Sequence, residues 1–446
     1  MNKQYQVKKL IHPIDWTVTV PGSKSMTNRV LLLAALQQGK ITVEGVLFSD
    51  DSRVFLGSLQ SLGFDLQIDE EKKQVILEGY GGKIPKQEAE IYVGSAGTAA
   101  RFLTAMLGCS EGTYVINASE QMKKRPMRPL FELLEKLGAK IEYLEQEYFL
   151  PVRITGCRKQ QVVEVATESL ENAERENRKY MELDISKSTQ FLSAMLLIAP
   201  MFPQGLQIHI TSEKTDGSYI RITRHMMEEF GVTATFDGTD YFVPANASYY
   251  KERYTVEPDM SAACYFYAAA AMTGGRAKVR NVHMDNTQGD LKFLDVLKQL
   301  GCKVQESPEG IEVTGPEMGE LKGIHINMND FSDQTMTLAA IAPFCKEKVR
   351  IEGIAHIRLQ ESDRLHAIAT ELTRLGVRCE EKEAAITIYP GMPQAGVVET
   401  YEDHRMAMAF SLIGLMVDGI VIDNPDCCRK TFENYFEILE DICTNY

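Results

Sequence analysis

Residues 22–36, GSKSMTNRVLLLAAL, consist of a short polar cluster followed by an apolar run rich in leucine and alanine. A run that is apolar on nearly all sides predicts a buried helix. The start of such a helix carries unpaired N–H groups and the positive end of the helix dipole, which favour anion binding. The same pattern occurs five more times, as GSAGTAARFLTAML (94–107), SKSTQFLSAMLLIA (186–199), PDMSAACYFYAAAA (258–271), FSDQTMTLAAIA (331–342) and YEDHRMAMAFSLIG (401–414).

The spacing of these six stretches indicates a repeated structural unit. Polar residues cap ordinary helices as well, but ordinary capping does not produce a period, and a period of this size predicts a repeated supersecondary unit. We therefore expect several helix ends to face one polar, anion-binding centre. The polar clusters are 70 to 74 residues apart, except for one interval of 93, when they are anchored on Ser23, Ser95, Ser188, Asp259, Asp333 and Asp403.

A second repeat marks the ends of other helices. Five charged, amphipathic segments end in a glycine that precedes a short apolar segment, and this pattern predicts a helix stopped by a left-handed residue before a strand. The C-terminal stretch 432–446 resembles a sixth such helix, and we expect the segment before Pro21 to supply its missing strand. The five glycines are Gly63, Gly138, Gly231, Gly301 and Gly376.

Composition places the chain among soluble globular proteins. Its 446 residues suit two domains of about 200 residues each. The longest apolar runs, 191–202 and 406–417, are too short to span a bilayer, and the first residues lack the apolar core of a signal peptide. Nine scattered cysteines without a CxxC pair favour free thiols in the cytoplasm over a metal site or a cysteine nucleophile.

Charge patterning predicts an enzyme with small anionic substrates. A net charge of −14 argues against nucleic acid as a partner. Neither a P-loop nor a GxGxxG turn is present, so ATP- or NAD-dependent chemistry is not expected. The repeat anchors of the first half are cationic or hydroxylic, whereas those of the second half add carboxylates beside further cations. These second-half groups are Asp259, Asp333, Glu361, Arg364, Asp403, Arg405 and Lys430.

Nine ordered motifs give the chain a family resemblance. They are PGSKSMTNR, GSAGTAAR, KKRPM, SKSTQF, PDMSAA, SDQTMT, QESDR, YEDHRMAM and RKTF, and together they resemble the 3-phosphoshikimate 1-carboxyvinyltransferase (EPSP synthase) family. The resemblance implies an α/β fold of two similar domains, each of three βαβαββ repeats in an inside-out α/β barrel, with the active site in the cleft between them. It places residues 1–20 and 257–446 in the first domain, with the catalytic carboxylates, and residues 21–256 in the second, which binds shikimate 3-phosphate.

The resemblance also implies a reaction and its residues. The 5-hydroxyl of shikimate 3-phosphate adds to C2 of phosphoenolpyruvate, C3 is protonated, and the adduct eliminates phosphate without a metal or organic cofactor. Asp333 is implied as the base, Glu361 as the acid, and Lys24 as a catalytic contact to both substrates. The implied shikimate 3-phosphate set is Lys24, Ser25, Arg29, Ser188, Thr189, Gln190, Tyr219, Asp333, His356 and Gln360; the phosphoenolpyruvate set is Lys24, Gly97, Arg125, Gln190, Arg364, Arg405 and Lys430.

Several positions depart from the family pattern. Gln360, His356 and Ser95 stand where Lys, Asn and Asn are common. In the loop SEKTDGSY (212–219), Ser218 or Lys214 is a better phosphate contact than an ionised Asp216. The charged stretch 167–184 resembles a solvated surface insertion.

Other interpretations remain open. Asp333 by itself could cap a helix, Glu361 could lie in a solvated first turn, and Arg101 and Asp259 could brace helix ends. A sister enzyme transfers enolpyruvyl to UDP-N-acetylglucosamine, but it typically has a Cys where Glu120 stands here. A catalytically idle anion-binding protein of the same fold is the other alternative. We expect a monomer with small-molecule substrates and no membrane partner.

Overall fold

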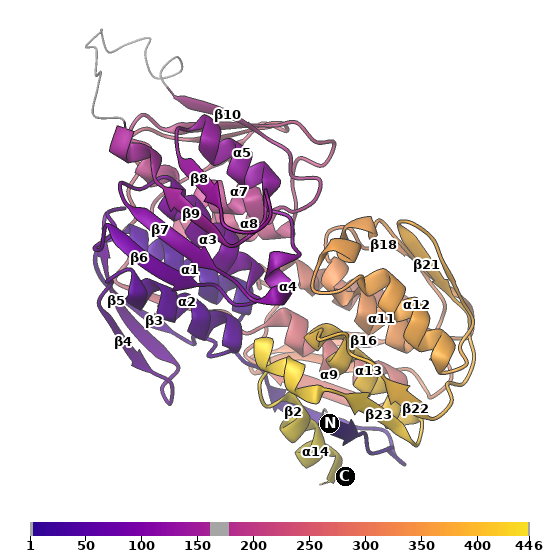
Figure 1. The fold of residues 1–446 in the computed structure, drawn as a ribbon. Coiled ribbons are helices and arrows are strands. Elements are labelled where there is room, and N and C mark those ends of the chain that lie inside the picture. The colour runs from indigo at the N-terminus through magenta and orange to yellow at the C-terminus, as the bar shows by residue number, and fades with distance from the viewer. Residues whose placement is uncertain (1–2, 161–177, 445–446) are drawn as a thin grey trace. The chain divides into compact units, whose positions relative to one another are not determined.

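The structure is a computed structural model that describes residues 3–160 and 178–444 (Figure 1). The chain divides into two compact units. Unit 1 comprises Met1–Pro21 and Glu257–Tyr446, and unit 2 comprises Gly22–Val256.

Unit 2 repeats one arrangement of strands and helices. In the sheet ordered β6-β7-β9-β8, β6 and β7 are parallel and the other pairs are antiparallel. The sheets β10-β11-β13-β12 and β14-β3-β5-β4 have the same pattern. The strands are β3 (Gln38–Glu44), β4 (Leu66–Asp69), β5 (Gln74–Tyr80), β6 (Glu88–Tyr92), β7 (Thr113–Asn117), β8 (Lys140–Tyr143), β9 (Val152–Thr155), β10 (Lys179–Leu183), β11 (Leu206–Ile210), β12 (Thr235–Phe236), β13 (Asp240–Val243) and β14 (Arg253–Thr255).

Unit 1 repeats the same arrangement. Its sheets are β16-β17-β15-β2, β18-β19-β21-β20 and the three-stranded β1-β23-β22. The expected α/β fold of βαβαββ repeats is therefore confirmed within each unit. The strands are β1 (Gln4–Gln6), β2 (Asp15–Thr19), β15 (Arg276–Arg280), β16 (Lys303–Ser307), β17 (Gly310–Thr314), β18 (His325–Asn327), β19 (Val349–Glu352), β20 (Cys379–Glu381), β21 (Ala385–Ile388), β22 (Gly396–Val398) and β23 (Ile420–Asp423).

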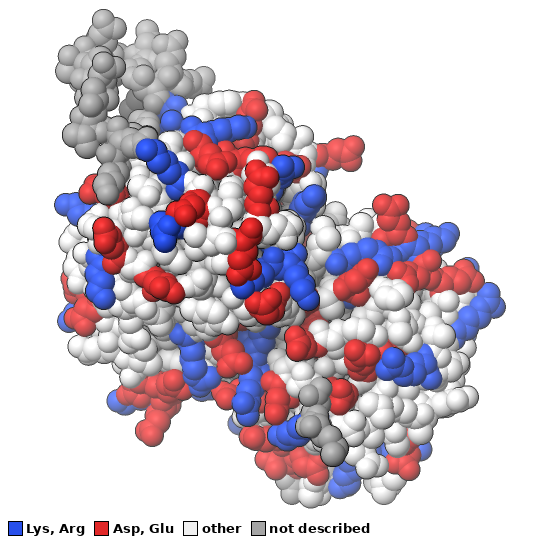
Figure 2. All heavy atoms as spheres, in the orientation of Figure 1, with Lys and Arg blue, Asp and Glu red and all other residues white. Residues whose placement is uncertain are grey.

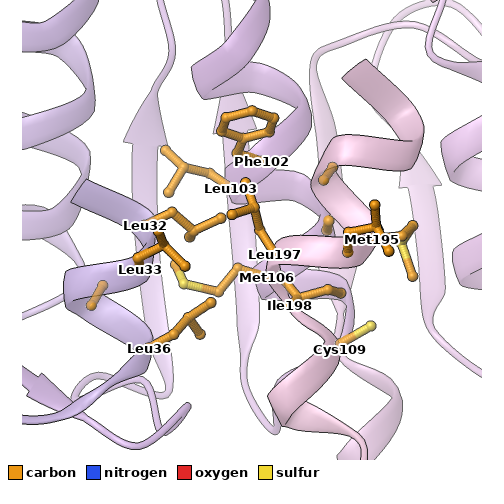
Figure 3. Packing of buried hydrophobic residues seen from close by; sticks show 14 of the residues in the cluster. Leu32, Leu33, Leu36, Phe102, Leu103, Met106, Cys109, Met195, Leu197 and Ile198 are labelled. Atoms are coloured by element: carbon orange, nitrogen blue, oxygen red, sulfur yellow. The ribbon is translucent and has the colours of Figure 1, made fainter. Parts of the chain in front are cut away.

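The six apolar stretches form the central helices of the two units, as predicted. Side chains of the three in unit 2 point toward one another, with Leu32, Met106 and Leu197 among them (Figure 3). In unit 1, the corresponding three helices also pack on one another. They are buried on nearly all sides because each is enclosed by its neighbours and the surrounding sheets. The helices are α1 (Lys24–Leu36), α3 (Gly97–Gly108), α7 (Gln190–Leu197), α9 (Met260–Thr273), α11 (Thr335–Ile341) and α13 (His404–Met416).

The second repeat is also confirmed. The helices that end before the predicted glycines are α2 (Asp50–Ser61), α5 (Arg128–Lys136), α8 (Ser218–Glu229), α10 (Phe293–Leu300) and α12 (Arg364–Arg374). All five glycines have φ between +80° and +109°, a conformation that costs a residue with a Cβ atom more than glycine. The C-terminal helix α14 (Tyr435–Thr444) follows β23, and β1 from the N-terminal segment pairs antiparallel with β23, as expected.

One prediction needs correction. Most of the supposed insertion 167–184 lies outside the described residues, but Lys179–Leu183 form β10, which pairs in parallel with β11. The surface interpretation is therefore wrong for this part, because Met181 and Leu183 enter the core of unit 2.

The exterior carries both signs of charge. On the face shown in Figure 2, acidic and basic side chains are interspersed over both units. Within the two described stretches of chain, the helices are all too short or too polar to cross a membrane. All nine cysteines lie in those stretches as free thiols.

Candidate active site

Four short segments of unit 1 gather the predicted catalytic groups. Asp333 lies in the 3₁₀ turn η4 (Ser332–Gln334), which leads into α11. Arg364 is the first residue of α12, and Glu361 lies between this helix and the preceding turn η6 (Ala355–Leu359). Arg405 is the second residue of α13, and Lys430 ends the turn η7 (Pro425–Lys430). The repeat therefore brings together groups that precede or begin different helices, and their side chains form one ion-pair cluster.

Arg364 is the centre of this cluster. Its side chain is 2% exposed, and Nε donates to Oδ2 of Asp403 at 2.7 Å. Nη1 donates to Asp333 at 3.0 Å and to the amide oxygen of Gln360, and Nη2 donates to Glu361 at 2.9 Å and to Asp403 at 3.2 Å. Burial by itself lowers the pKa of Arg364, but the three carboxylates offset this effect and raise it. All five N–H donors of this guanidinium are thus directed at acceptors in unit 1.

Asp333 lies between two guanidinium groups. Oδ1 accepts a hydrogen bond from Arg364 at 3.0 Å, and Oδ2 accepts one from Arg405 at 2.8 Å. The N-cap residues here are Phe331 for η4 and Gln334 for α11. The helix-capping interpretation of Asp333 is therefore wrong, and its carboxylate is held by charge-assisted hydrogen bonds instead.

Glu361 belongs to the same cluster. Oε2 accepts a hydrogen bond from Arg364, and Oε1 lies 3.3 Å from Nζ of Lys430. The side chain is 11% exposed, so its interpretation as part of a solvated helical turn is wrong. Two other predicted residues lie beside the cluster: Nε2 of His356 is 2.8 Å from the hydroxyl of Ser332, and Gln360 contacts Arg364.

Asp403 is a residue whose role the sequence did not reveal. It is fully buried, caps α13 by accepting from the backbone N–H of Arg405 at 3.0 Å, and forms the two-point ion pair with Arg364. The sequence signal was the Asp-His-Arg run at the start of a buried helix, which requires a partner for the arginine. Arg405 pairs with Asp333, whereas the neighbouring Asp403 pairs with Arg364.

The predicted phosphate-binding residues of unit 2 lie at the starts of its central helices. Nζ of Lys24 is 3.4 Å from a carboxylate oxygen of the buried Asp51, a partner that the sequence did not suggest. Ser25 contacts the hydroxyl of Ser23 at 3.2 Å. At the start of α7, Thr189 is the N-cap residue, and the hydroxyl of Ser188 accepts from the backbone N–H of Gln190 at 3.3 Å.

Arg29 is more deeply buried than a surface phosphate contact. Its three nitrogen atoms donate to the carbonyl oxygen atoms of Ser25 and Tyr219 and to the hydroxyl of Thr223, at 2.8 to 3.1 Å. Its guanidinium lies 5.4 Å from the ring centroid of Phe102. Burial lowers the pKa of Arg29 to about 10. Arg29 therefore fixes the backbone at both Ser25 and Tyr219.

Two arginines cover the backbone of Gly97. A Cβ atom at this glycine would lie 2.6 Å from Nη1 of Arg101 and 2.8 and 2.9 Å from the Nη atoms of Arg125. Nη1 of Arg101 donates to the carbonyl oxygen of Gly97 at 3.1 Å and to the side chain of Gln190 at 2.9 Å. Arg101, interpreted from the sequence as a brace, thus connects two predicted substrate contacts, at the starts of α3 and α7.

The loop before α8 contains Asp216, whose carboxylate has two partners. Asp216 forms an ion pair with Arg221 at 2.6 Å and accepts from the hydroxyl of Tyr241 at 3.2 Å. A Cβ atom at Gly217 would lie 3.5 Å from the methyl group of Thr189 and 3.8 Å from Nζ of Lys214. Gly217 therefore packs against both Thr189 and Lys214, while the carboxylate of Asp216 is engaged by its own partners.

Comparison with known proteins identifies the family. The sequence model of EPSP synthase (3-phosphoshikimate 1-carboxyvinyltransferase) matches residues 8–439. The chain belongs to the EPSP synthase family. A 3-phosphoshikimate 1-carboxyvinyltransferase of Trichormus variabilis is 41% identical over 96% of this chain and 97% of its own, and one of Sulfurovum sp. is 39% identical over 97% and 98%. Solved EPSP synthase structures from Acinetobacter baumannii share the fold, one with a TM-score of 0.79, 24% identity and 98% coverage of both chains.

Membership of the EPSP synthase family confirms the resemblance predicted from the nine motifs. The chain is a transferase of aromatic amino acid biosynthesis by the shikimate pathway. The family assignment excludes the catalytically idle alternative and favours 3-phosphoshikimate over UDP-N-acetylglucosamine as the acceptor.

Proposed function

We propose that this chain transfers the enolpyruvyl group of phosphoenolpyruvate to the 5-hydroxyl of shikimate 3-phosphate with Asp333 as the base and Glu361 as the acid. The observation that supports this assignment is that one buried guanidinium, Arg364, holds both carboxylates. The reaction needs a proton removed from a hydroxyl and another delivered to a methylene carbon. Asp333, paired with Arg405, and Glu361, paired with Lys430, supply two carboxyl groups for these two proton transfers.

The residues that bind phosphoenolpyruvate are assigned from the charges of the substrate and of the side chains. Phosphoenolpyruvate carries a phosphate and a carboxylate, and we assign to it Lys24, Gly97, Arg125, Gln190, Arg364, Arg405 and Lys430. The planar guanidinium groups can bind each anion through two parallel hydrogen bonds. Because the donors of Arg364 are occupied in the structure, its part in this clamp requires a substrate oxygen to replace one of its present partners.

For shikimate 3-phosphate we propose a set of residues on the grounds of the family motifs. The set is Lys24, Ser25, Arg29, Ser188, Thr189, Gln190 and Tyr219 in unit 2, with Asp333, His356 and Gln360 in unit 1. The helix N-terminus at Thr189 and the ammonium of Lys214, both close to Gly217, favour an anion. Arg29 contributes by holding Ser25 and Tyr219 in place, since its own donors are used inside unit 2.

We also propose that the enzyme works as a cytoplasmic monomer. All the groups that the reaction requires are present in one chain, and the chemistry needs an acid, a base and cations but no metal or organic cofactor. Nine free cysteines suit a reducing compartment.

Release of inorganic phosphate tests the proposed reaction. Purified protein mixed with shikimate 3-phosphate and phosphoenolpyruvate is expected to release phosphate in an amount equal to the enolpyruvyl product. Omitting either substrate should abolish release, and UDP-N-acetylglucosamine should not replace shikimate 3-phosphate. Phosphate release from phosphoenolpyruvate alone, or with the nucleotide sugar, would contradict the proposal.

A Gly97→Ala substitution tests the phosphoenolpyruvate site. The added methyl group lies within 2.9 Å of both guanidinium groups, so Arg101 and Arg125 must shift. We expect the KM for phosphoenolpyruvate to rise by about tenfold, because a single misplaced methyl group typically costs that much in a fitted site. The family inhibitor glyphosate, which we assign to the same site, should bind more weakly as well. Steady-state kinetics measures both effects, with the KM for shikimate 3-phosphate as the internal control. An equal change in both KM values would contradict the assignment of Gly97 to the phosphoenolpyruvate site.

A further inference from the structure

A buried carboxylate that the reaction above does not use lies behind the turn of Asp333. Asp290 belongs to the 3₁₀ turn η3 (Gly289–Lys292) and is 6% exposed. Its Oδ2 accepts two hydrogen bonds, one from the hydroxyl of Ser261 in α9 and one from the amide nitrogen of Gln334 at 2.9 Å. Burying a carboxylate destabilises the folded protein unless hydrogen bonds or opposite charges compensate for the lost hydration. The position of Asp290 beside the proposed base therefore needs a physical explanation.

Gln334 connects this carboxylate to the base. It directly follows Asp333 in η4, and its side-chain nitrogen donates to Asp290. Its side-chain oxygen accepts from the hydroxyl of Thr337 at 2.9 Å. With both ends of its amide engaged, Gln334 has one orientation, and the turn that presents Asp333 to Arg364 and Arg405 is anchored from behind.

Asp290 and Asp333 also interact electrostatically. The charged or titratable groups that face Asp290 are Asp333 from η4, Arg405 from α13 and Cys264 from α9. Burial and the Asp333 carboxylate together raise the pKa of Asp290 to about 6, against the opposing effect of Arg405. Burial, Asp290 and Asp259 likewise raise the pKa of the Cys264 thiol, so this thiol stays neutral. Asp290 and Asp333 therefore act on each other and share the field of Arg405.

We infer that Asp290 is a positioning residue for Asp333, whose turn it holds in place through the side chain of Gln334. The inference rests on the proposed role of Asp333 as the base. Asp290 itself touches neither substrate nor reacting atom in this account.

Two substitutions separate the hydrogen bonds from the charge. In Asp290→Asn, the amide oxygen can occupy the position of Oδ2 and accept both hydrogen bonds, so chiefly the charge is lost. In Asp290→Ala, both the charge and the anchor of Gln334 are lost. The matched control is Glu371→Gln, which removes a carboxylate that is equally buried in α12 but is bonded to Tyr401.

The readout is kcat, with the KM values measured beside it. For Asp290→Asn we expect kcat within about threefold of the wild type, because the amide oxygen keeps the hydrogen bond from Gln334. For Asp290→Ala we expect kcat to fall by about tenfold, because the turn that carries Asp333 loses its anchor and a displaced catalytic group lowers the rate. The KM values of both variants should stay near those of the wild type.

A second readout does not depend on catalysis. Folding raises the pKa of Asp290 from 3.8 to about 6, so its ionisation destabilises the fold; this penalty is absent below pH 3.8 and complete above about pH 6. The free energy of unfolding of the wild type should therefore fall relative to that of Asp290→Asn across this window and then stay parallel to it. A flat difference would contradict the buried, coupled state of Asp290.

The outcomes separate the inference about Asp290 from the proposed base. If Asp333→Asn abolishes turnover but Asp290→Ala turns over like the wild type, the base assignment stands and the inference about Asp290 is overturned. If Asp333→Asn is active, the proposed base is wrong whatever Asp290 does. A kcat that falls as far in Glu371→Gln as in Asp290→Ala would also overturn the inference, because loss of any buried carboxylate would then produce the effect.

Discussion

Replacing Asp333 with Asn is expected to lower kcat by about 10²–10⁴-fold, the range typical of a lost general base. The two carboxylate oxygens of Asp333 accept from Arg364 and Arg405. The amide of Asn keeps one acceptor, turns an N–H toward the other guanidinium, and has no basic site for the proton of the 5-hydroxyl. The protein should still fold, since Arg364 keeps Asp403 and Glu361 as partners.

The measurement compares turnover with binding. Calorimetric titration should show that Asp333→Asn binds shikimate 3-phosphate within about tenfold of the wild type while turnover falls much further. Asp333→Glu is the informative partner variant, because it keeps a base but displaces it by one methylene group; we expect it to retain more turnover than the Asn variant. A kcat within tenfold of the wild type for Asp333→Asn would contradict the assignment.

Asp403→Ala is expected to cause the largest loss of stability. The carboxylate of Asp403 is fully buried, caps α13 and pairs with Arg364 through Nε and Nη2. Its removal leaves a buried guanidinium short of a partner and a helix start without its cap. Breaking a buried pair from one side typically costs about 3–5 kcal/mol of the free energy of unfolding.

Asp363→Ala provides a matched control for this loss. Asp363 also caps a helix, α12, by accepting from the backbone N–H of His366 at 3.0 Å, and it also pairs with an arginine, Arg358. Its side chain is 44% exposed, so water replaces what the substitution removes. We expect a loss of about 1 kcal/mol, the usual worth of a cap with a partly exposed ion pair.

The single tryptophan makes the comparison specific to unit 1. Trp16 lies in β2 at 2% exposure, so its fluorescence follows the unfolding of this unit. Urea titrations of both variants should be read at Trp16 and compared as free energies at equal slope. Similar losses for Asp403→Ala and Asp363→Ala would mean that burial of the Arg364 pair does not stabilise unit 1.

The repeats could be predicted from the sequence because the signals that carry them are local. An apolar run must be enclosed on all sides, and a glycine that ends a helix at positive φ is recognisable from its neighbours alone. Gly63 and Gly376 illustrate this: both were predicted to be left-handed, and both have φ of at least +80°. The family motifs extended the prediction to Asp333, Glu361 and Arg405 as members of a catalytic set, although no local signal showed what each side chain contacts.

Local sequence patterns were thus enough to predict the helices, their ends, the repeated unit and the kinds of charged group at each helix start. The pairing of those groups depends on the tertiary fold. Arg364 could have paired with Glu361 alone, three residues away, but the packing of α12 beside η4 and α13 also brings Asp333 and Asp403 to its guanidinium. The same packing set Asp290 behind Asp333, which no pattern had indicated. Ion pairs between distant residues depend on how helices pack, and burial decides their strength, so neither can be predicted from one segment of the chain.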